Sequence, residues 1–260
     1  MYSWLIYGNF WIAFGAIGIT CTSSFIMYDQ VDIKVLIIVF LATILGYNYQ
    51  CYISAIYSKK QYKKDKWILS RVRALITISA LSLLGCIILV LYTFNLIEIA
   101  CFLPFGFITL CYRWPLLGKA LRDVPYIKIF LISITWGFVS VMLPSFSMHD
   151  LNDLNWQLIF VNSIYIFCIT IPFDIRDLKH DDVSQKTLPQ IYGVKTSVLI
   201  ACLGLIFVGI FYFKIEYYGL MIHSLLSIII VYMSIKKKED WYYSFIIDGL
   251  LILFPIFILI

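Results

Sequence analysis

The feature that most constrains this chain is a series of apolar segments, each long enough to cross a lipid bilayer as a helix. The hydrocarbon core of a membrane is about 30 Å thick, which about 20 helical residues span. Since lipid offers no hydrogen-bond partner to the backbone, continuous apolar segments must be helices rather than open strands. The sequence therefore predicts an all-α polytopic membrane protein, a bundle of nine transmembrane helices at roughly residues 9–28, 33–56, 69–93, 95–112, 126–144, 156–173, 197–214, 218–235 and 244–260.

These segments account for most of the chain, so we expect one transmembrane domain over residues 1–260. Of the 260 residues, 62% are hydrophobic and 13% are charged, which is more apolar surface than a soluble domain of this length can bury. The first segment follows an uncharged stretch without a cleavage-site pattern, and we expect it to be a spanning helix rather than a removable signal. The seven cysteines are scattered without a CxxC pair, which argues against a zinc site or a disulfide framework.

The basic residues indicate which side of the membrane each loop faces. With nine spans, 18 of the 20 Lys and Arg residues fall on the side of the N-terminus, and only Lys34 and Lys214 fall on the other. Cytoplasmic loops carry such an excess, so we expect the N-terminus and these loops to be cytoplasmic and the protein to lie in the inner membrane of a cell. The net charge of +5 is then a topology signal, and binding of nucleic acid is not expected.

A group of acidic residues follows the sixth apolar segment, on the side that carries the positive charge. Asp174, Asp177 and Asp181 are spaced by three and four residues, which places them along one face of a helix. Adjacent carboxylates repel one another unless a cation neutralises them. One interpretation is a solvated acidic face beside the membrane, and the other is a binding site for a metal ion.

Basic side chains surround this acidic motif on the same side of the membrane. Lys and Arg bind phosphate oxygens directly, while Mg²⁺ takes one or two carboxylates and keeps its other positions for water and phosphate. The chain thus offers the mixed site that a magnesium diphosphate requires, with Mg²⁺ as the expected cofactor. The basic residues concerned are Arg113, Lys119, Arg122, Arg176, Lys179 and Lys186.

The segment DIRDLKHDDVSQKTLPQIYGVKTS, residues 174–197, resembles the second aspartate-rich motif and following loop of the UbiA superfamily of intramembrane prenyltransferases. The family pattern is roughly Asp-x-x-Asp-x-x-x-Asp, then Lys-Thr or Lys-Ser, Leu-Pro and Gly-x-Lys. Residues 121–137 are also similar to the family's fifth helix and the connection before it, and nine helices with a cytoplasmic N-terminus fit the family. The matching positions of the motif are Asp174, Asp177, Asp181, Lys186, Thr187, Leu188, Pro189, Gly193 and Lys195.

The resemblance implies an enzyme that binds a prenyl diphosphate through Mg²⁺, with two acidic motifs at the ends of the second and sixth helices. The prenyl tail would lie among the helices, and loss of diphosphate would leave an allylic cation for an aromatic or other small acceptor to attack. On this resemblance Asp174, Asp177 and Asp181 are the catalytic residues and the metal ligands. The expected diphosphate-binding residues are Asn48, Tyr52, Tyr112, Arg113, Lys119, Arg122 and Lys186.

The first motif departs from the family pattern, which is Asn-Asp-x-x-Asp-x-x-x-Asp near the end of the second helix. Asn48 matches the leading Asn, but the aspartate positions fall on Tyr49, Tyr52 and Ile56. An amide and two phenols are poor substitutes for carboxylates as ligands of Mg²⁺, so the sequence supports one metal ion at most.

Two further positions bear on the expected site. In the family's Tyr-x-x-x-Lys pattern after the fourth helix, Tyr112 fits, the lysine position is Leu116, and Lys119 lies three residues further on. Asp248 lies about two turns inside the last segment, where an ionisable group is a functional candidate or part of helix packing.

Three functions remain open from the sequence. The first is a prenyltransferase that uses a prenyl diphosphate and an unknown acceptor within the lipid bilayer. The second is a UbiA-type terpene cyclase that folds its own prenyl chain without an acceptor. The third is a non-catalytic relative that binds an isoprenoid, which the missing first motif favours.

Overall fold

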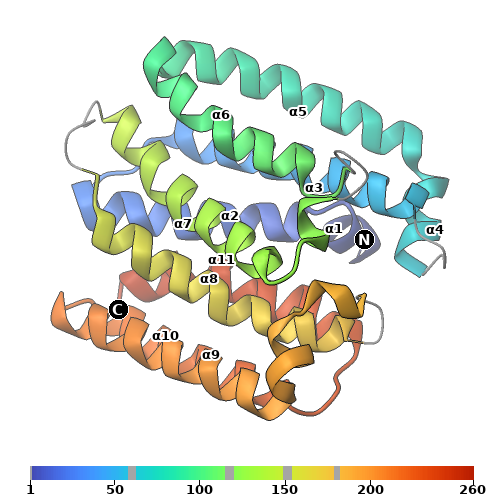
Figure 1. Ribbon diagram of the computed structural model, residues 1–260. Helices are drawn as coiled ribbons and strands as arrows, with labels where there is room; N and C mark the ends of the chain where they lie inside the picture. The colour runs from blue at the N-terminus through green and yellow to red at the C-terminus, as the bar shows by residue number, and fades with distance from the viewer. Residues whose placement is uncertain (1, 58–62, 115–119, 149–153, 179–181) are drawn as a thin grey trace.

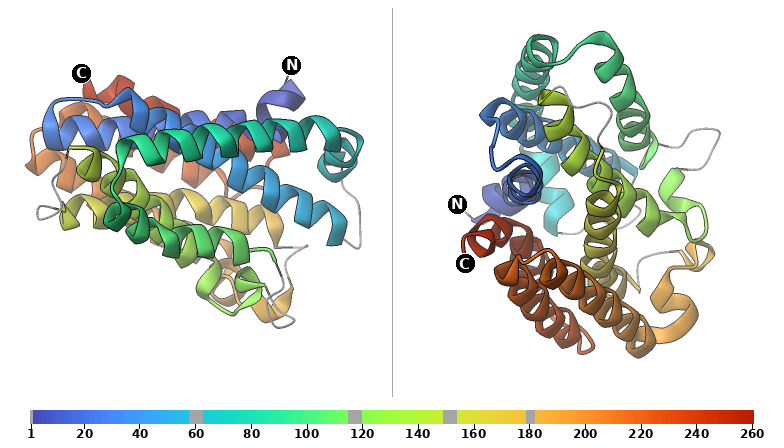
Figure 2. Two further views of the ribbon diagram at one scale, coloured as in Figure 1. Left: turned by 90° about the horizontal axis from the view of Figure 1, so that it is seen from above. Right: turned by 90° about the vertical axis from the view of Figure 1, so that its left-hand side faces the viewer.

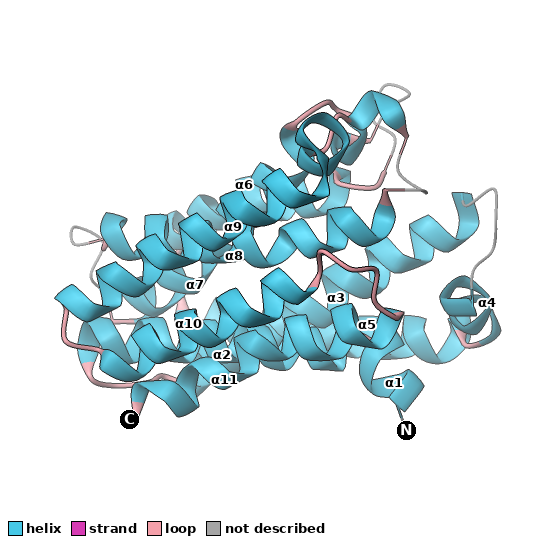
Figure 3. Ribbon diagram, turned by 90° about the horizontal axis from the view of Figure 1, so that it is seen from below, coloured by secondary structure: helices cyan, strands magenta, loops and turns pink. Residues whose placement is uncertain are grey.

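The computed structural model describes residues 2–57, 63–114, 120–148, 154–178 and 182–260, and within these ranges the chain is helical without any strand (Figures 1 and 3). This confirms the all-α prediction. The helices are α1 (Tyr2–Tyr7), α2 (Phe10–Tyr28), α3 (Ile33–Tyr57), α4 (Lys63–Ser70), α5 (Val72–Thr93), α6 (Leu96–Cys111), α7 (Ile127–Ser147), α8 (Trp156–Asp177), α9 (Leu188–Lys214), α10 (Tyr218–Met233) and α11 (Asp248–Ile258), with the short 3₁₀ turns η1 (Leu121–Asp123) and η2 (Val183–Gln185) and the π-helical η3 (Tyr242–Ile247).

Six of the described helices, α2, α3, α5, α7, α8 and α9, are long and apolar enough to cross a membrane, and three shorter apolar stretches accompany them: α6, α10 and Tyr242–Ile258. Each expected segment coincides with one of these stretches. Large apolar side chains of α5 point away from the protein, including Leu81 and Leu91, which are 64% and 65% exposed. Such a surface is stable against lipid, so the chain is a multi-pass integral membrane protein.

Two helices differ from the expected segments in a way that matters for the motif. Helix α8 continues four residues beyond its expected end, to Asp177, so that Asp174 and Asp177 lie in its last turn. Helix α9 begins at Leu188 instead of residue 197, because the polar KTLPQ stretch forms a helix start: Pro189 lies in the first turn, and the Gln190 side chain accepts the Thr187 N–H at 2.9 Å.

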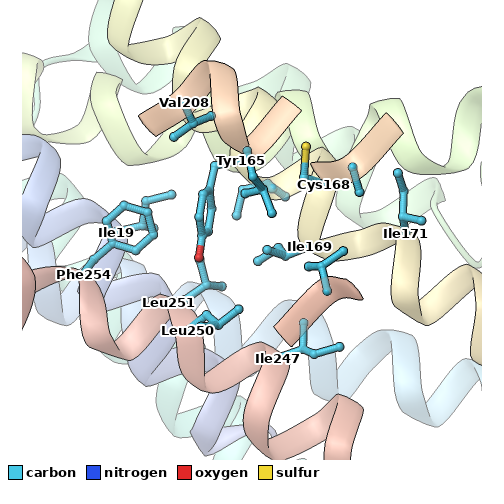
Figure 4. Close-up of a cluster of buried hydrophobic side chains, with 14 of the residues drawn as sticks. Ile19, Tyr165, Cys168, Ile169, Ile171, Val208, Ile247, Leu250, Leu251 and Phe254 are labelled. Atoms are coloured by element: carbon cyan, nitrogen blue, oxygen red, sulfur yellow. The ribbon is translucent and has the colours of Figure 1, made fainter. Parts of the chain in front are cut away.

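Helix α8 lies at the centre of the bundle, between α7 and α9, while α2 packs against α11 (Figures 1 and 2). Figure 4 shows fully buried Tyr165 of α8 among Ile19 of α2, Val208 of α9 and Leu251 of α11. At Gly18 the contact between α2 and α11 is so close that a Cβ atom would lie 2.1 Å from the carbonyl oxygen of Leu251. Small residues permit such close packing of membrane helices.

Polar side chains also connect the helices inside the apolar core. The side-chain amide of Asn162 on α8 donates to Ser23 of α2 at 2.9 Å and to Ser140 of α7 at 3.0 Å. All three residues are at most 2% exposed. With no water to replace these partners, the bonds fix α8 relative to α2 and α7.

The ends of α3, α6 and α8 meet at one end of the bundle, together with the starts of α7 and α9 (Figure 1). We call this the motif end. The N-terminus and α4 lie there as well, and the C-terminus lies at the opposite end. The fold thereby brings the ends of three helices that are far apart in the sequence to the same end of the bundle.

Candidate functional site

The two described carboxylates of the aspartate motif each face a basic side chain. Asp174, which is 1% exposed, places Oδ1 2.9 Å from Nζ of Lys128 in the first turn of α7. Asp177 receives both arms of a fork from Arg176, with Nε at 2.7 Å from Oδ1 and Nη2 at 3.1 Å from Oδ2. Their helical spacing is as expected, and the structure adds the cations that neutralise them.

Arg176 is also held by aromatic rings. Its guanidinium carbon lies 5.2 Å from the ring centre of Phe173 and 5.7 Å from that of Tyr243 in η3. Asp248, at the start of α11, is close enough for its charge to interact with that of Arg176. The acidic residue inside the last segment therefore belongs to the same polar cluster as the motif.

Short connections at the motif end hold the basic residues near the end of α8. The backbone N–H of Arg122 donates to the carbonyl of Tyr112 at 3.1 Å, and that of Tyr126 donates to the carbonyl of Gln185 at 3.0 Å. Asp123 receives the side-chain amide of Gln185 at 2.9 Å. These bonds tie η1 to the end of α6 and join the α6–α7 connection, through η1 and Tyr126, to η2 in the α8–α9 connection.

A small cavity opens beside the Lys128–Asp174 pair, lined by Tyr126, Phe130, Gln185, Lys186 and Thr187 among others. The side-chain oxygens of Gln185 and Thr187 are buried there, and no described residue forms a hydrogen bond with them. Lys186 lies at the surface, with Nζ 5.6 Å from the ring centre of Tyr126. The expected diphosphate residue Lys186 is thus an exposed residue at the edge of this cavity.

On the opposite side of the site, α3 presents neutral polar groups. Asn48 is 4% exposed, and its Oδ1 accepts the side-chain N–H of Asn9 at 2.9 Å, while its own Nδ2 finds no hydrogen-bond partner among the described residues. Arg113, after the end of α6, donates from Nη1 to Ser54 Oγ at 2.6 Å. Tyr52 is partly exposed and makes no side-chain hydrogen bond with the residues that the structure describes.

The groups on the two sides of the site lie within electrostatic range of one another. Burial lowers the pKa of Arg113, the nearby Arg122 lowers it further, and the negative charge of Asp177 opposes the shift. Asp177 is in turn within electrostatic range of Lys128 and Arg122. Of the expected site residues, Tyr112, Arg113, Arg122, Asp174 and Asp177 therefore lie near one another, Asn48 lies beside Asn9 on the α3 side, and Lys119 and Asp181 lie outside the described residues.

The sequence offered no signal for some of the residues in this cluster. Asn9 and Ser54 are single polar residues in or beside apolar segments, and such residues most often serve helix packing. Lys128 is one of the 18 basic residues that indicate the membrane orientation, and its position in the sequence does not connect it with the aspartate motif. Tyr47 of α3 packs edge-to-face with Trp136 of α7, at 6.4 Å between ring centres, and aromatic residues are too frequent here to stand out.

The donor groups decide how well a magnesium ion fits. Where side chains are described, no three Cys, His, Asp or Glu residues come together as a metal site. Asp174 and Asp177 are bound to cations, and the α3 side offers an amide and hydroxyls but no carboxylate. The α3 side therefore does not fit Mg²⁺, and on the α8 side an ion would need Asp177 to leave Arg176.

We compared the sequence and the structure with those of known proteins. The sequence matches no family model and no curated protein. The structure is similar to the apo structure of a UbiA homolog from Aeropyrum pernix K1, with 14% sequence identity and a TM-score of 0.67 over 95% of this chain and 94% of that one. It is also similar to a digeranylgeranylglyceryl phosphate synthase, with 18% identity and a TM-score of 0.55 over 100% of this chain and 98% of that one. These likenesses show the UbiA fold over the whole chain.

Proposed function

We propose that this chain, which has the fold of the UbiA superfamily, is an integral-membrane prenyltransferase. It would transfer a prenyl group from a prenyl diphosphate to an aromatic or other small acceptor. The observation that carries the proposal is the convergence of Arg113, Arg122 and Lys128 with the α8 carboxylates at one end of an apolar bundle. A ligand with a charged head and a long apolar tail suits such a site.

The basic side chains would drive the reaction by stabilising the leaving group. As the bond between the allylic carbon and the diphosphate oxygen breaks, negative charge develops on the diphosphate, and guanidinium or ammonium donors fixed near it lower the barrier. The allylic cation would then face aromatic rings, for which Tyr47 and Trp136 beside the cluster are suited. The acceptor adds to this carbon and loses a proton.

The aspartates of α8 would have two roles. Asp174 holds Lys128 in the first turn of α7, and Asp177 holds Arg176, so both orient cations toward the substrate head. If Mg²⁺ binds, Asp177 and Asp181 with Asp174 adjacent would hold it, and the ion would supply further positive charge for the phosphate oxygens. The excess of basic residues at the motif end supports a cytoplasmic orientation of the site, and an inner-membrane location.

The test is turnover of labelled farnesyl, geranylgeranyl and longer prenyl diphosphates by membranes that contain the protein, with and without Mg²⁺, followed by extraction of products. We expect release of diphosphate that is lost in the Asp177→Asn, Asp181→Asn double variant. Asp32→Asn is the matched control. Asp32 pairs with Lys34 at the start of α3, and the motif end of the bundle is where α3 ends. Full activity of the double variant would refute the proposal, and products formed without an acceptor would indicate a cyclase.

One observation favours a second candidate, a non-catalytic protein that binds an isoprenoid. The described carboxylates of the motif are both engaged by cations, and α3 carries none. This candidate predicts that a prenyl diphosphate binds without Mg²⁺ and is recovered intact after long incubation. Measured turnover excludes it.

A further inference from the structure

The guanidinium group of Arg113 is held at the site by a hydrogen bond to an uncharged side chain. Its Nη1 donates to the hydroxyl of Ser54 at 2.6 Å, and among the described residues it forms no ion pair. It is partly buried where α3 and α6 end. A charge removed from water without a partner of opposite sign is costly, so the position is best explained by an anion that binds there.

The neighbouring surface of α3 offers hydrogen-bond donors in place of carboxylates. Asn48 is buried, its Oδ1 accepts a hydrogen bond from Asn9, and its Nδ2 is a buried donor without a partner in the part of the chain that the structure describes. Cys51, one turn further along α3, also lies against Asn9, with 3.8 Å between Sγ and the side-chain amide. Free N–H groups bind phosphate oxygens and cannot bind a metal cation.

Charge balance points in the same direction. A carboxylate and the Mg²⁺ ion that it binds have a combined charge of +1. The guanidinium group of one arginine has the same charge without a metal ion. Among the described residues Lys128 pairs with Asp174, Arg176 pairs with Asp177 and Arg122 pairs with Asp123, whereas Arg113 forms no such ion pair. A diphosphate would supply negative charge on the side where Arg113 lies.

We propose that Arg113, positioned by Ser54, takes the place of a metal ion on the α3 side and binds the substrate diphosphate directly, together with the side-chain N–H of Asn48. The diphosphate is then bound on this side without a carboxylate-metal bridge. This inference rests on the proposed use of a prenyl diphosphate, and it specifies how the charged head is recognised.

The experiment measures binding separately from turnover. The purified full-length protein in detergent is titrated calorimetrically with inorganic pyrophosphate and with a non-reactive farnesyl thiolodiphosphate, once in EDTA and once in Mg²⁺. We expect both probes to bind in EDTA, and Arg113→Gln to weaken this binding by about ten- to a hundredfold, the usual range for a charge-assisted hydrogen bond. Arg113→Lys, which keeps the charge and loses the fork, should recover part of the affinity.

Controls separate direct binding from loss of structure. Arg73→Gln removes an exposed guanidinium of α5 outside the cluster and should leave the affinity unchanged. Ser54→Ala keeps the charge of Arg113 but removes its anchor, so a several-fold loss is expected. Thermal unfolding of each variant in the same detergent identifies any that fail to fold, and the Arg113→Lys variant then carries the test.

The possible results distinguish this inference from the proposed function. If the probes bind only in Mg²⁺, or if Arg113→Gln and Arg113→Lys bind as the parent does in EDTA, the inference is wrong while a prenyl diphosphate site remains. If neither probe binds under any condition, the inference and the proposed function both fail. Binding in EDTA that depends on Arg113 supports the inference whether or not turnover is observed.

Discussion

Lys128 and Asp174 form an ion pair inside the bundle, and replacing Lys128 by Ala would remove the cation 2.9 Å from a carboxylate that is only 1% exposed. Breaking a buried pair by removing one partner typically costs about 3–5 kcal/mol, because the remaining charge stays in a medium that solvates it poorly. Lys128 is itself 7% exposed, so water does not readily take its place. We expect Lys128→Ala to lower the free energy of unfolding by that amount.

The measurement is reversible unfolding in mixed micelles with increasing SDS, followed by circular dichroism. The double variant Lys128→Met, Asp174→Leu should recover most of the loss, since neither charge then remains. The matched control is Lys34→Ala, whose partner Asp32 lies 3.5 Å away with the Lys34 side chain 45% exposed. An exposed pair contributes at most about 1 kcal/mol.

Two results would contradict this reasoning about burial. One is a Lys128→Ala protein as stable as the Lys34→Ala control. The other is a double variant as unstable as Lys128→Ala, because the cost would then come from lost packing rather than from an uncompensated charge.

Two further predictions concern packing between the helices. Gly18→Ala should destabilise the protein by about 1–3 kcal/mol, since its Cβ would lie 2.1 Å from the Leu251 carbonyl oxygen. Gly106→Ala should be neutral or stabilising in the same SDS titration, because its added Cβ would meet no described atom within 4 Å beyond the adjacent residues and the backbone of its own helix. Equal effects of the two changes would argue against close packing of α2 on α11. Asn162→Ala should cost about 1–2 kcal/mol through its lost bonds to the serines of α2 and α7, and unchanged unfolding would show that these bonds do not hold α8 in place.

The boundaries of the apolar segments were largely readable from the sequence, because a lipid-exposed helix must be apolar along its whole length. The start of α9 was not, since residues 188–196 mix polar and apolar side chains with a proline and a glycine, and become helical through capping at Thr187 and Gln190. Pro189 and Gln190 are the local signal that could have found it. The same stretch bends at Gly193, where φ is 78° and a side chain would be strained.

The sequence predicted the helical arrangement of the site's aspartates but not the residues that pair with them. Spacing correctly placed Asp174 and Asp177 within one helix, since period alone fixes which residues share a face. The partner of each carboxylate could not be predicted: Arg176 is a neighbour in sequence, but Lys128 is 46 positions away from Asp174 on another helix.

The sequence by itself determined the all-α membrane architecture, because hydrocarbon imposes its requirement on every span separately and each span carries the evidence in its own residues. Only the tertiary structure decided what the polar residues do. It brought the guanidinium of Arg113 within hydrogen-bond distance of the hydroxyl of Ser54, 59 positions earlier in the chain. Ser54 belongs to α3, which lacks the aspartates of the family's first motif. Such a pairing depends on how the helices pack, and that is the sum of many contacts, none of which is visible in a single segment.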